Sequence, residues 1–132
     1  MDPLRLKETC LYVKDLEATA TFYEGKLGLP KFSFFDGSHV FFRVESCVLL
    51  CFMNSATKQK TALPPHYAEG NMHFAFDTTK AAYDQWRQKV VDAGIEIEHD
   101  HTWPGGFRSF YFRDPDQHLV EILEDGMWEY KG

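Results

Sequence analysis

The sequence predicts an α+β fold made of two βαβββ modules, whose strands form a cupped mixed β-sheet with the helices on its outer face. Strand-like and helix-like segments follow one another in the same order twice, and a polar segment separates the two series. The spacing also repeats, because Glu8 precedes the helix-ending Gly28 by 20 residues and His73 precedes Gly94 by 21. Each module alone has too small a core to be comfortably stable, so the two are expected to share a concave face.

The first module covers residues 8–53. Residues 8–13 predict a strand, and Asp15 is a typical helix N-cap. Apolar residues at helical spacing then predict a helix over 16–28, which Gly28 is suited to end. Further strands are expected at residues 30–35, 39–45 and 47–53.

The second module covers residues 71–123 and repeats this order. A strand is predicted at 71–76, and Asp77, Thr78 or Thr79 can cap a helix over 80–94. The remaining strands are expected at residues 95–100, 107–112 and 118–123, with the loop "TWPGG" between the first two.

The whole chain, residues 1–132, is predicted to be a single domain. Residues 54–70 are polar and contain two prolines, so they are the predicted linker between the modules. Residues 124–132 form a tail without a clear assignment.

Composition narrows the classes of function. The net charge of −6 argues against nucleic acid and against an anionic membrane surface as partners. No apolar run approaches the roughly 20 residues of a transmembrane helix, and the N-terminus has no signal-peptide core. The three cysteines form no CxxC pair, so a disulfide framework is not expected. A reduced, cytoplasmic protein is therefore expected.

A carboxylate stands in an unusual place in the last predicted strand. In "FRDPDQHLVEIL", residues 112–123, apolar residues surround Glu121 on both sides. Strand side chains alternate between faces, so both faces of this strand are apolar and the strand should be largely buried. A buried carboxylate needs a partner or a metal. If no metal is bound, an ion pair with Arg108 or Arg113 is expected instead.

These residues resemble the vicinal oxygen chelate superfamily, which includes glyoxalases, bleomycin-resistance proteins, fosfomycin-resistance enzymes and extradiol dioxygenases. The resemblance rests on "ETCLYVKDLEATATFYEGKLGL", "MHFAFD" and "GGFRSFYFRDPDQHLVEIL", and it covers nearly the whole chain. It implies paired βαβββ units around a divalent metal, whose ligands come from the first and fourth strands. Zn, Ni, Mn and Fe all suit such ligands.

By position, the resemblance places the metal ligands at Glu8, His73 and Glu121. It also implies that Glu8 and Glu121 are the catalytic carboxylates, and that Cys51 occupies the equivalent last-strand position of the first module. Two carboxylates would balance a divalent charge and a neutral imidazole would add a third donor, which leaves coordination positions open for substrate. Without a metal, His73 would be a core histidine, Glu8 a solvated residue at a strand start and Cys51 a small buried hydrophobe.

Several further residues are candidates for substrate contact. Aromatic side chains near the cup can form its wall, although about half of them should be plain core. Gly105 and Gly106 would let their loop close over a ligand, or they form a simple turn. His66 lies in the linker, and His118 is expected at the surface. His99 and His101 are expected to be solvated loop histidines, or else mobile acid–base groups or substrate contacts. The substrate-binding candidates are Cys51, Phe34, Phe42, Trp103, Phe107 and Arg108.

The expected function is that of a divalent-metal-dependent, glyoxalase-like enzyme, a lyase or isomerase acting on a small substrate through two neighbouring oxygens. The metal would polarise a carbonyl, and a carboxylate beside it would move a proton. A ring-cleaving dioxygenase is less expected, because such iron sites use two histidines and one carboxylate. A metal-free protein that sequesters a drug or small molecule, as bleomycin-resistance proteins do, is a different class of function that the resemblance allows, and a structural remnant is another. The resemblance also implies a homodimer.

Overall fold

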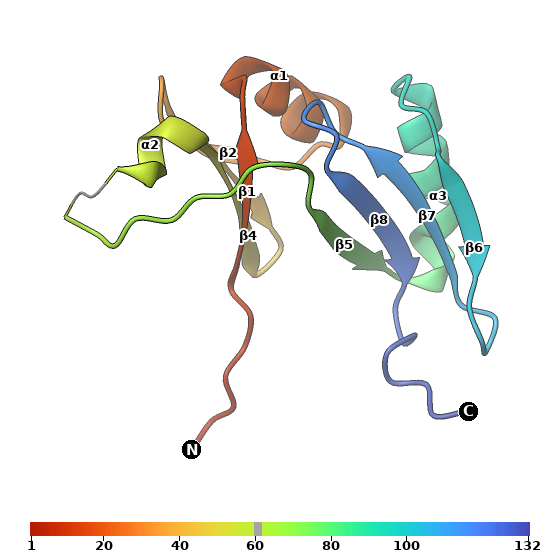
Figure 1. Cartoon of the computed structure of the whole chain (residues 1–132). Helices are drawn as coiled ribbons and strands as arrows, with labels where there is room; N and C mark the ends of the chain where they lie inside the picture. Colours follow the sequence, from red (N-terminus) through yellow and green to blue (C-terminus); the bar gives the residue numbers. More distant parts are fainter. Residues whose placement is uncertain (60–61) are drawn as a thin grey trace. The chain divides into compact units, whose positions relative to one another are not determined.

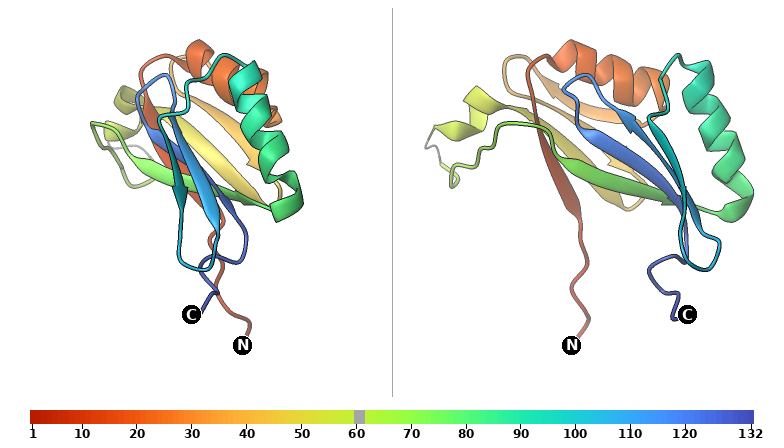
Figure 2. Two further views of the ribbon diagram at one scale, coloured as in Figure 1. Left: turned by 90° about the vertical axis from the view of Figure 1, so that its right-hand side faces the viewer. Right: turned by 45° about the vertical axis from the view of Figure 1, so that its right-hand side comes forward.

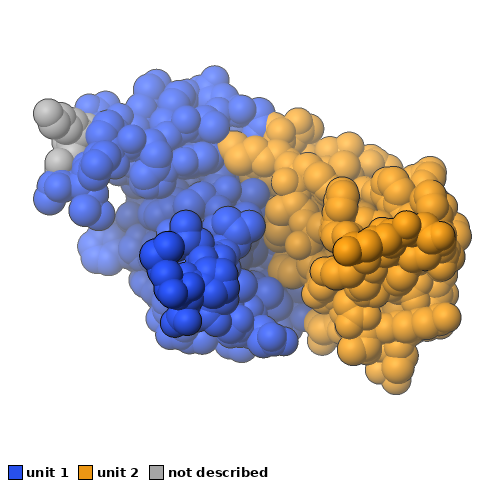
Figure 3. Space-filling model, turned by 90° about the horizontal axis from the view of Figure 1, so that it is seen from below, with its two compact units in different colours: residues 1–70 blue, residues 71–132 orange. Residues whose placement is uncertain are grey.

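The computed structural model describes residues 1–59 and 62–132, and it divides the chain into two compact units, 1–70 and 71–132 (Figures 1 and 3). Within the described residues, each unit contains one four-stranded mixed sheet, with the strand orders β1-β4-β3-β2 and β5-β8-β7-β6. The predicted α+β class and its two βαβββ modules are therefore confirmed. Residues 60 and 61 of the predicted linker lie outside the described residues.

The first unit begins with the predicted strand–helix pair. The Asp15 carboxylate accepts the N–H of Ala18 at 3.1 Å, so Asp15 is the N-cap of the first helix. That helix continues as a π-helical turn, which apolar residues at 3.6-residue spacing do not predict. The elements are β1 (Glu8–Val13), α1 (Leu16–Ala20), η1 (Thr21–Lys26), β2 (Lys31–Phe35), β3 (His39–Val44), β4 (Cys47–Met53) and α2 (Asn54–Lys58).

The second unit repeats the pattern with a longer helix. Thr79 is the N-cap of this helix and accepts the N–H of Ala82 at 3.2 Å. Figure 2 shows α3 lying along one face of its sheet. The elements are β5 (His73–Thr78), α3 (Lys80–Asp92), β6 (His99–Thr102), β7 (Arg108–Arg113) and β8 (Leu119–Glu124).

The strand predicted at 95–100 begins later than expected. Ile95 still belongs to the helix end, because its N–H donates to the carbonyl of Val90 at 3.2 Å. Ile95 is buried although it lies before the strand. The pairing with β7 starts with Glu98, whose N–H donates to Tyr111, and β6 itself covers His99–Thr102.

Each sheet packs one face against its own helices. Strand alternation assigns the remaining side chains to the opposite face, which we call the helix-distal face. In the first unit the buried helix side contains Leu11, Val13, Tyr23, Val40, Phe42 and Leu49. In the second it contains Tyr83, Val90, Phe110, Phe112, Val120 and Ile122.

The two sheets have matching registers at the parallel strand pairs. Glu8 lies opposite Val48 and Cys10 opposite Leu50, just as His73 lies opposite Leu119 and Ala75 opposite Glu121. Glu121 therefore corresponds to Leu50 in the first unit. The prediction that Cys51 occupies this position is wrong by one residue, because spacing along the chain does not show the lengths of the intervening turns.

Candidate metal centre in the second unit

His73 and Glu121 lie side by side on the helix-distal face of the second sheet. They belong to the neighbouring parallel strands β5 and β8, and the register offsets them by one alternation step. The Glu121 side chain turns back toward the strand start, so that its Oε1 lies 3.2 Å from Nε2 of His73. Two residues that are 48 positions apart in the chain therefore present a nitrogen and an oxygen to the same spot.

The backbone fixes the orientation of the His73 ring. Its Nδ1 lies 2.9 Å from the carbonyl oxygen of Leu119, which is the cross-strand partner of His73. A carbonyl can only accept, so Nδ1 carries the proton and donates it. With Nδ1 as the donor, Nε2 can carry a second proton and form an ion pair with Glu121 Oε1, or, in the neutral ring, present its lone pair to a metal ion held beside that oxygen.

Glu121 is buried, and one of its carboxylate oxygens lacks a hydrogen-bond donor among the described residues. Its side chain is only 7% exposed, and its Oε2 has no hydrogen-bond partner among the residues that the structure describes. An arginine does not fill this role, because both candidates are engaged elsewhere. Arg108 pairs with Glu124 and Asp84, and Arg113 pairs with Glu98.

This donor set fits a divalent metal ion. A neutral imidazole and a carboxylate are ligands that zinc, nickel, manganese and iron all accept. Ligand atoms held at about 2.0–2.2 Å from one ion lie roughly 3 Å apart when they are neighbours, close to the spacing found here. A buried carboxylate oxygen without a donor is also what such an ion would satisfy.

Glu8, the third predicted ligand, belongs to the first unit. It opens β1 at the position that corresponds to His73, and it is exposed. Over residues 1–59 and 62–132, no group of three or more His, Cys, Asp or Glu side chains gathers into a metal site. The role of Glu8 as third ligand therefore stays a prediction.

A row of rings extends from His73 across the helix-distal face. It consists of Tyr111, His99, His101 and Trp103. Successive centroids, starting from His73, are separated by 6.2, 5.9, 5.6 and 4.4 Å. The indole N–H of Trp103 donates to the hydroxyl of Ser109 at 2.9 Å, which holds the last ring on this face.

Tyr111 is a member of this site that no pattern in the sequence singled out. It pairs across the strands with Glu121. Burial raises the pKa of its hydroxyl and hydrogen bonding with Ser109 lowers it, while the charge of Glu121 and hydrogen bonding with its carboxylate both raise it. Alternation along β7 places Tyr111 on the same face as Ser109, so this residue could have been found once the strand order was known.

Three predicted substrate contacts lie on the helix side of the first sheet. Cys51 and Phe42 are fully buried, and the Phe42 ring packs 5.6 Å from that of Tyr23. Phe34 lies opposite Val40 and therefore shares this face. For Cys51, the burial agrees with its interpretation as a small core residue.

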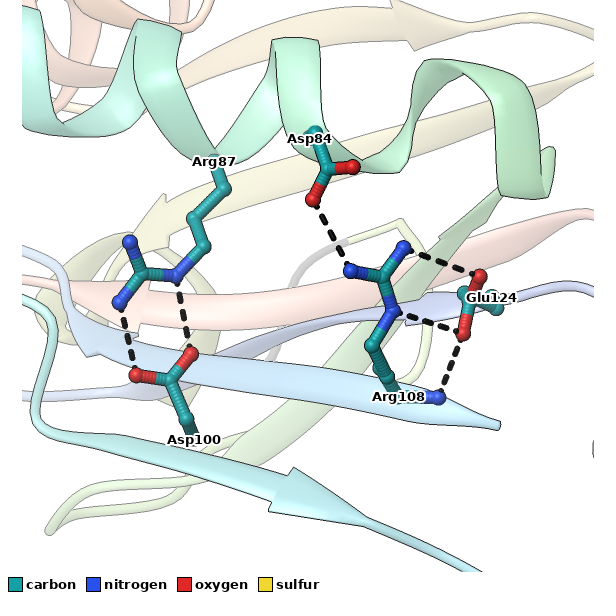
Figure 4. A network of polar contacts seen from close by, with 5 residues as sticks. All are labelled: Asp84, Arg87, Asp100, Arg108 and Glu124. Atoms are coloured by element: carbon teal, nitrogen blue, oxygen red, sulfur yellow. Dashed lines mark hydrogen bonds and ion pairs between the residues drawn. The ribbon is translucent and has the colours of Figure 1, made fainter. Parts of the chain in front are cut away.

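Arg108 lies on the helix side of the second sheet (Figure 4). Its backbone N–H and its guanidinium donate to the buried carboxylate of Glu124, and its Nη1 lies 3.0 Å from Asp84 on α3. The guanidinium also stacks 4.3 Å from the ring of Tyr83. Burial, with the charge of Asp100 adding to it, raises the pKa of Tyr83 to about 12. These contacts tie the helix to the sheet rather than presenting Arg108 to a substrate.

Trp103 and Phe107 flank the glycine-containing loop. Trp103 donates its backbone N–H to the carbonyl of Phe107 at 2.7 Å, which closes a hairpin turn between β6 and β7. A side chain at Gly105 would come within 3.0 Å of the rings of Tyr130 and Phe107, so the C-terminal tail packs against this turn. Closure of this loop over a ligand stays a prediction.

The remaining histidines differ in their surroundings. His99 and His101 are exposed, as expected, but they lie in β6 rather than in a loop. His66 contacts the Tyr12 hydroxyl through Nδ1 at 2.7 Å. The prediction for His118 is wrong, because this residue is fully buried and its Nδ1 accepts the N–H of Met72 at 2.9 Å. A histidine after a turn signal gives no hint of such burial.

Together these features define a duplicated βαβββ protein with a candidate metal centre on its second sheet. A model of the Glyoxalase/Bleomycin resistance protein/Dioxygenase superfamily matches residues 5–122, and the chain belongs to this superfamily. Within the described residues, no helix is long and apolar enough to cross a membrane.

Similar proteins include enzymes named for glutathione chemistry. The structure of a lactoylglutathione lyase from Agrobacterium tumefaciens is 35% identical, with a TM-score of 0.92 over 98% of this chain and 100% of that one. A glutathione transferase, FosA, from Serratia marcescens is 28% identical over 89% of this chain and 78% of its own length. A glyoxalase/bleomycin resistance protein/dioxygenase from Nocardioides shares the fold, at 22% identity and a TM-score of 0.74 over 96% of this chain and 87% of that one.

Proposed function

We propose that this protein is a divalent-metal-dependent enzyme of the glyoxalase type, a lyase or isomerase acting on a small substrate through two neighbouring oxygens. The observation that carries the proposal is the His73–Glu121 pair, with its nitrogen and oxygen 3.2 Å apart and a second buried carboxylate oxygen without a donor among the described residues. Zinc, nickel, manganese or iron would be held by His73 and Glu121, with Glu8 as the third ligand. The ion would supply a Lewis acid that polarises a substrate oxygen.

The residues of the chain supply the rest of the chemistry. The Leu119 carbonyl accepts the proton of His73 Nδ1, so the ring would hold the ion through Nε2 without having to reorganise. Glu121, and with it Glu8, would take a proton from the substrate carbon and return it, which is the ordinary role of a carboxylate beside a polarised carbonyl. The Tyr111 hydroxyl lies in the next strand and can donate a hydrogen bond to a substrate oxygen. Trp103 and Phe107 remain candidate contacts at the rim.

A glutathione-linked substrate is the first class to test. The lactoylglutathione lyase and the FosA transferase both carry glutathione in their names. However, Leu50 stands where the register calls for a counterpart of Glu121, so the first unit has no carboxylate at that position. An enzyme with a carboxylate at this position in only one of its two units would divide the acid and base roles differently from an enzyme with one in each unit.

A second candidate function is metal-free sequestration of a drug or small molecule. It is favoured by the aromatic cluster on the helix-distal face of the first sheet, where His39 stacks on Phe41 at 3.9 Å and Phe52 packs edge-on at 5.3 Å from Phe41. Phe35 beside them is 67% exposed. Such a surface suits a flat apolar ligand.

Metal analysis of protein purified without chelators separates the two functions. We expect about one divalent ion per chain in the wild type. His73→Ala and the isosteric Glu121→Gln should each weaken metal binding by more than about 100-fold, as loss of a direct ligand does. His101→Ala and Glu98→Gln are matched controls on the same sheet and should bind like the wild type. Sub-stoichiometric metal in the wild type with every divalent ion tested would overturn the enzyme proposal and favour sequestration.

We also propose a homodimer in a reducing, cytoplasmic compartment. Members of this superfamily commonly form dimers, and the exposed rings of Phe32 and Phe35 form an apolar surface that a second copy can cover. No disulfide joins the cysteines at 10, 47 and 51, all of which lie in the part of the chain that the structure describes.

A further inference from the structure

We infer that His118 is a positioning residue for the candidate metal centre: its buried imidazole fixes the strand start from which His73 projects. The inference rests on the proposed function, since it concerns the same pair of ligands. His118 would act through the backbone hydrogen bonds that lie between its ring and the ring of His73.

Three hydrogen bonds connect His118 to the His73 ring. The N–H of Met72 donates to Nδ1 of His118 at 2.9 Å, and the N–H of Leu119 donates to the carbonyl of Met72 at 2.8 Å. The carbonyl of Leu119 then accepts the proton of His73 Nδ1 at 2.9 Å. Met72 precedes His73 and Leu119 follows His118 in the chain. The three hydrogen bonds therefore link the His118 imidazole to the Leu119 carbonyl that orients the His73 ring.

The turn before β8 fixes His118 from the other side. The Asp114 carboxylate accepts the N–H groups of both Asp116 and His118 at 2.9 Å, and the N–H of Asp114 donates to the His118 carbonyl at 3.1 Å. His118 is 0% exposed. The backbone of His118 and its Nδ1 are therefore both held, and the ring cannot swing away from Met72 without breaking a partly buried hydrogen bond.

The first unit shows what the strand pair is like without this histidine. Val48 donates its N–H to the carbonyl of Lys7 at 2.9 Å, which matches the Leu119–Met72 bond. Cys47 stands in the place of His118, and its Sγ contacts the carbonyl of Leu6 rather than accepting an N–H. The parallel pairing therefore forms without an imidazole. The additional acceptor, His118 Nδ1, occurs in the second unit, where His73 and Glu121 lie side by side.

The physical consequence is an effect on metal affinity. Groups that orient a ligating histidine typically contribute 10–100-fold to metal binding, because a ligand that must first be ordered binds more weakly. Removing the His118 acceptor frees the N–H of Met72 and loosens the carbonyl that selects the His73 tautomer.

The test compares three substitutions at position 118 in the full chain. In His118→Asn the amide oxygen replaces Nδ1 as acceptor, whereas His118→Leu removes it and His118→Gln moves the amide beyond reach. The affinity for Zn²⁺ is measured by calorimetry, the melting temperature by circular dichroism, and the His73 tautomer by long-range ¹H–¹⁵N spectra of the apo protein. Cys47→Leu is the control at the equivalent position.

We expect His118→Leu and His118→Gln to weaken Zn²⁺ binding by about 10–100-fold and to give His73 a mixture of tautomers. His118→Asn should restore both properties, and Cys47→Leu should leave them unchanged. If folded His118→Gln or His118→Leu keeps wild-type affinity and a single His73 tautomer, the inference is wrong. A lower melting temperature in these variants, without a change in the His73 tautomer, would also show that the inference is wrong. If the wild type binds no Zn²⁺ or other divalent ion, the proposed function fails, and the apo tautomer still decides the role of His118.

Discussion

Two buried glutamates in the same strand illustrate how environment decides the role of a side chain. Glu121 and Glu124 are three residues apart in β8, so they lie on opposite faces of the sheet. The Glu124 carboxylate accepts hydrogen bonds from the guanidinium and from the backbone N–H of Arg108. Glu121 faces an imidazole nitrogen and keeps an oxygen without a donor among the described residues. Glu124 is thus a structural carboxylate, whereas Glu121 is the carboxylate that the proposed function uses.

The Glu124–Arg108 pair predicts a loss of stability in acid. Burial acts to raise the pKa of Glu124, but the hydrogen bonds from Arg108 outweigh it and hold the pKa below the ordinary value of 4.5. A carboxyl with a depressed pKa in the folded state contributes stability above its ordinary value, and this contribution disappears as the pH falls through the folded pKa. We therefore expect wild-type stability to fall from about pH 4.5 downward.

Urea unfolding between pH 6 and pH 3 checks this expectation, with Glu124→Gln as the comparison. The variant should be less stable at pH 6 and should lose less stability in acid than the wild type. Parallel pH profiles for the two proteins would contradict the assignment. Asp100 has the same sign of shift, because its hydrogen bonds from Arg87 lower its pKa, so it contributes an acid slope to both proteins equally.

At the level of residues, the sequence could predict the unusual acid but not its surroundings. Alternation in β8 identified Glu121 as a buried carboxylate, and the structure agrees. The register that brings His73 beside it depends on strand pairing over 46 residues, which no local pattern contains. The same holds for Arg108, because its partners Glu124 and Asp84 become neighbours only after folding.

At the level of elements, the helix ends were the most predictable features. Asp15 and Thr79 cap their helices through side-chain oxygens, as the residue types indicate. Gly28 and Gly94 both adopt a φ of 79° where the helices stop. The π-helical turn was not predictable, because the bond from Leu27 N–H back to the Phe22 carbonyl depends on how that segment packs.

Gly94 offers a direct test of helix termination. A Cβ added there would meet no atom within 4 Å, so only the left-handed backbone conformation opposes a side chain. Gly94→Ala should lower the free energy of unfolding by about 1 kcal/mol, and Gly94→Asn by less, since asparagine tolerates this conformation. The measurement is the urea midpoint at an unchanged m-value. Equal midpoints for the wild type and Gly94→Ala would mean that the backbone adjusts without strain.

At the level of the whole molecule, the duplication was visible in the sequence because each half keeps its own order of strands and its own helix signals. The matching registers of β1–β4 and β5–β8 give this repeat a structural basis. The chemistry was less predictable, because the halves share a fold but not their side chains. Position 50 is leucine where position 121 is glutamate, and only strand pairing shows that these positions correspond.

The proposed dimer predicts the mass of the protein in solution. The chain has a mass of 15.4 kDa, so light scattering after size exclusion should give twice that value, 30.8 kDa. Phe35→Ser would remove the most exposed ring of the first sheet and should shift the population toward monomer. Phe35→Trp is a control that preserves the apolar surface. A wild-type mass of 15.4 kDa at micromolar concentration would contradict the dimer.

The shared register has a consequence for protein engineering. Glu8 and Leu50 occupy the places in the first sheet that His73 and Glu121 occupy in the second. A designer who wished to build a second His–Glu pair, in the first sheet, would therefore begin with two substitutions, Glu8→His and Leu50→Glu.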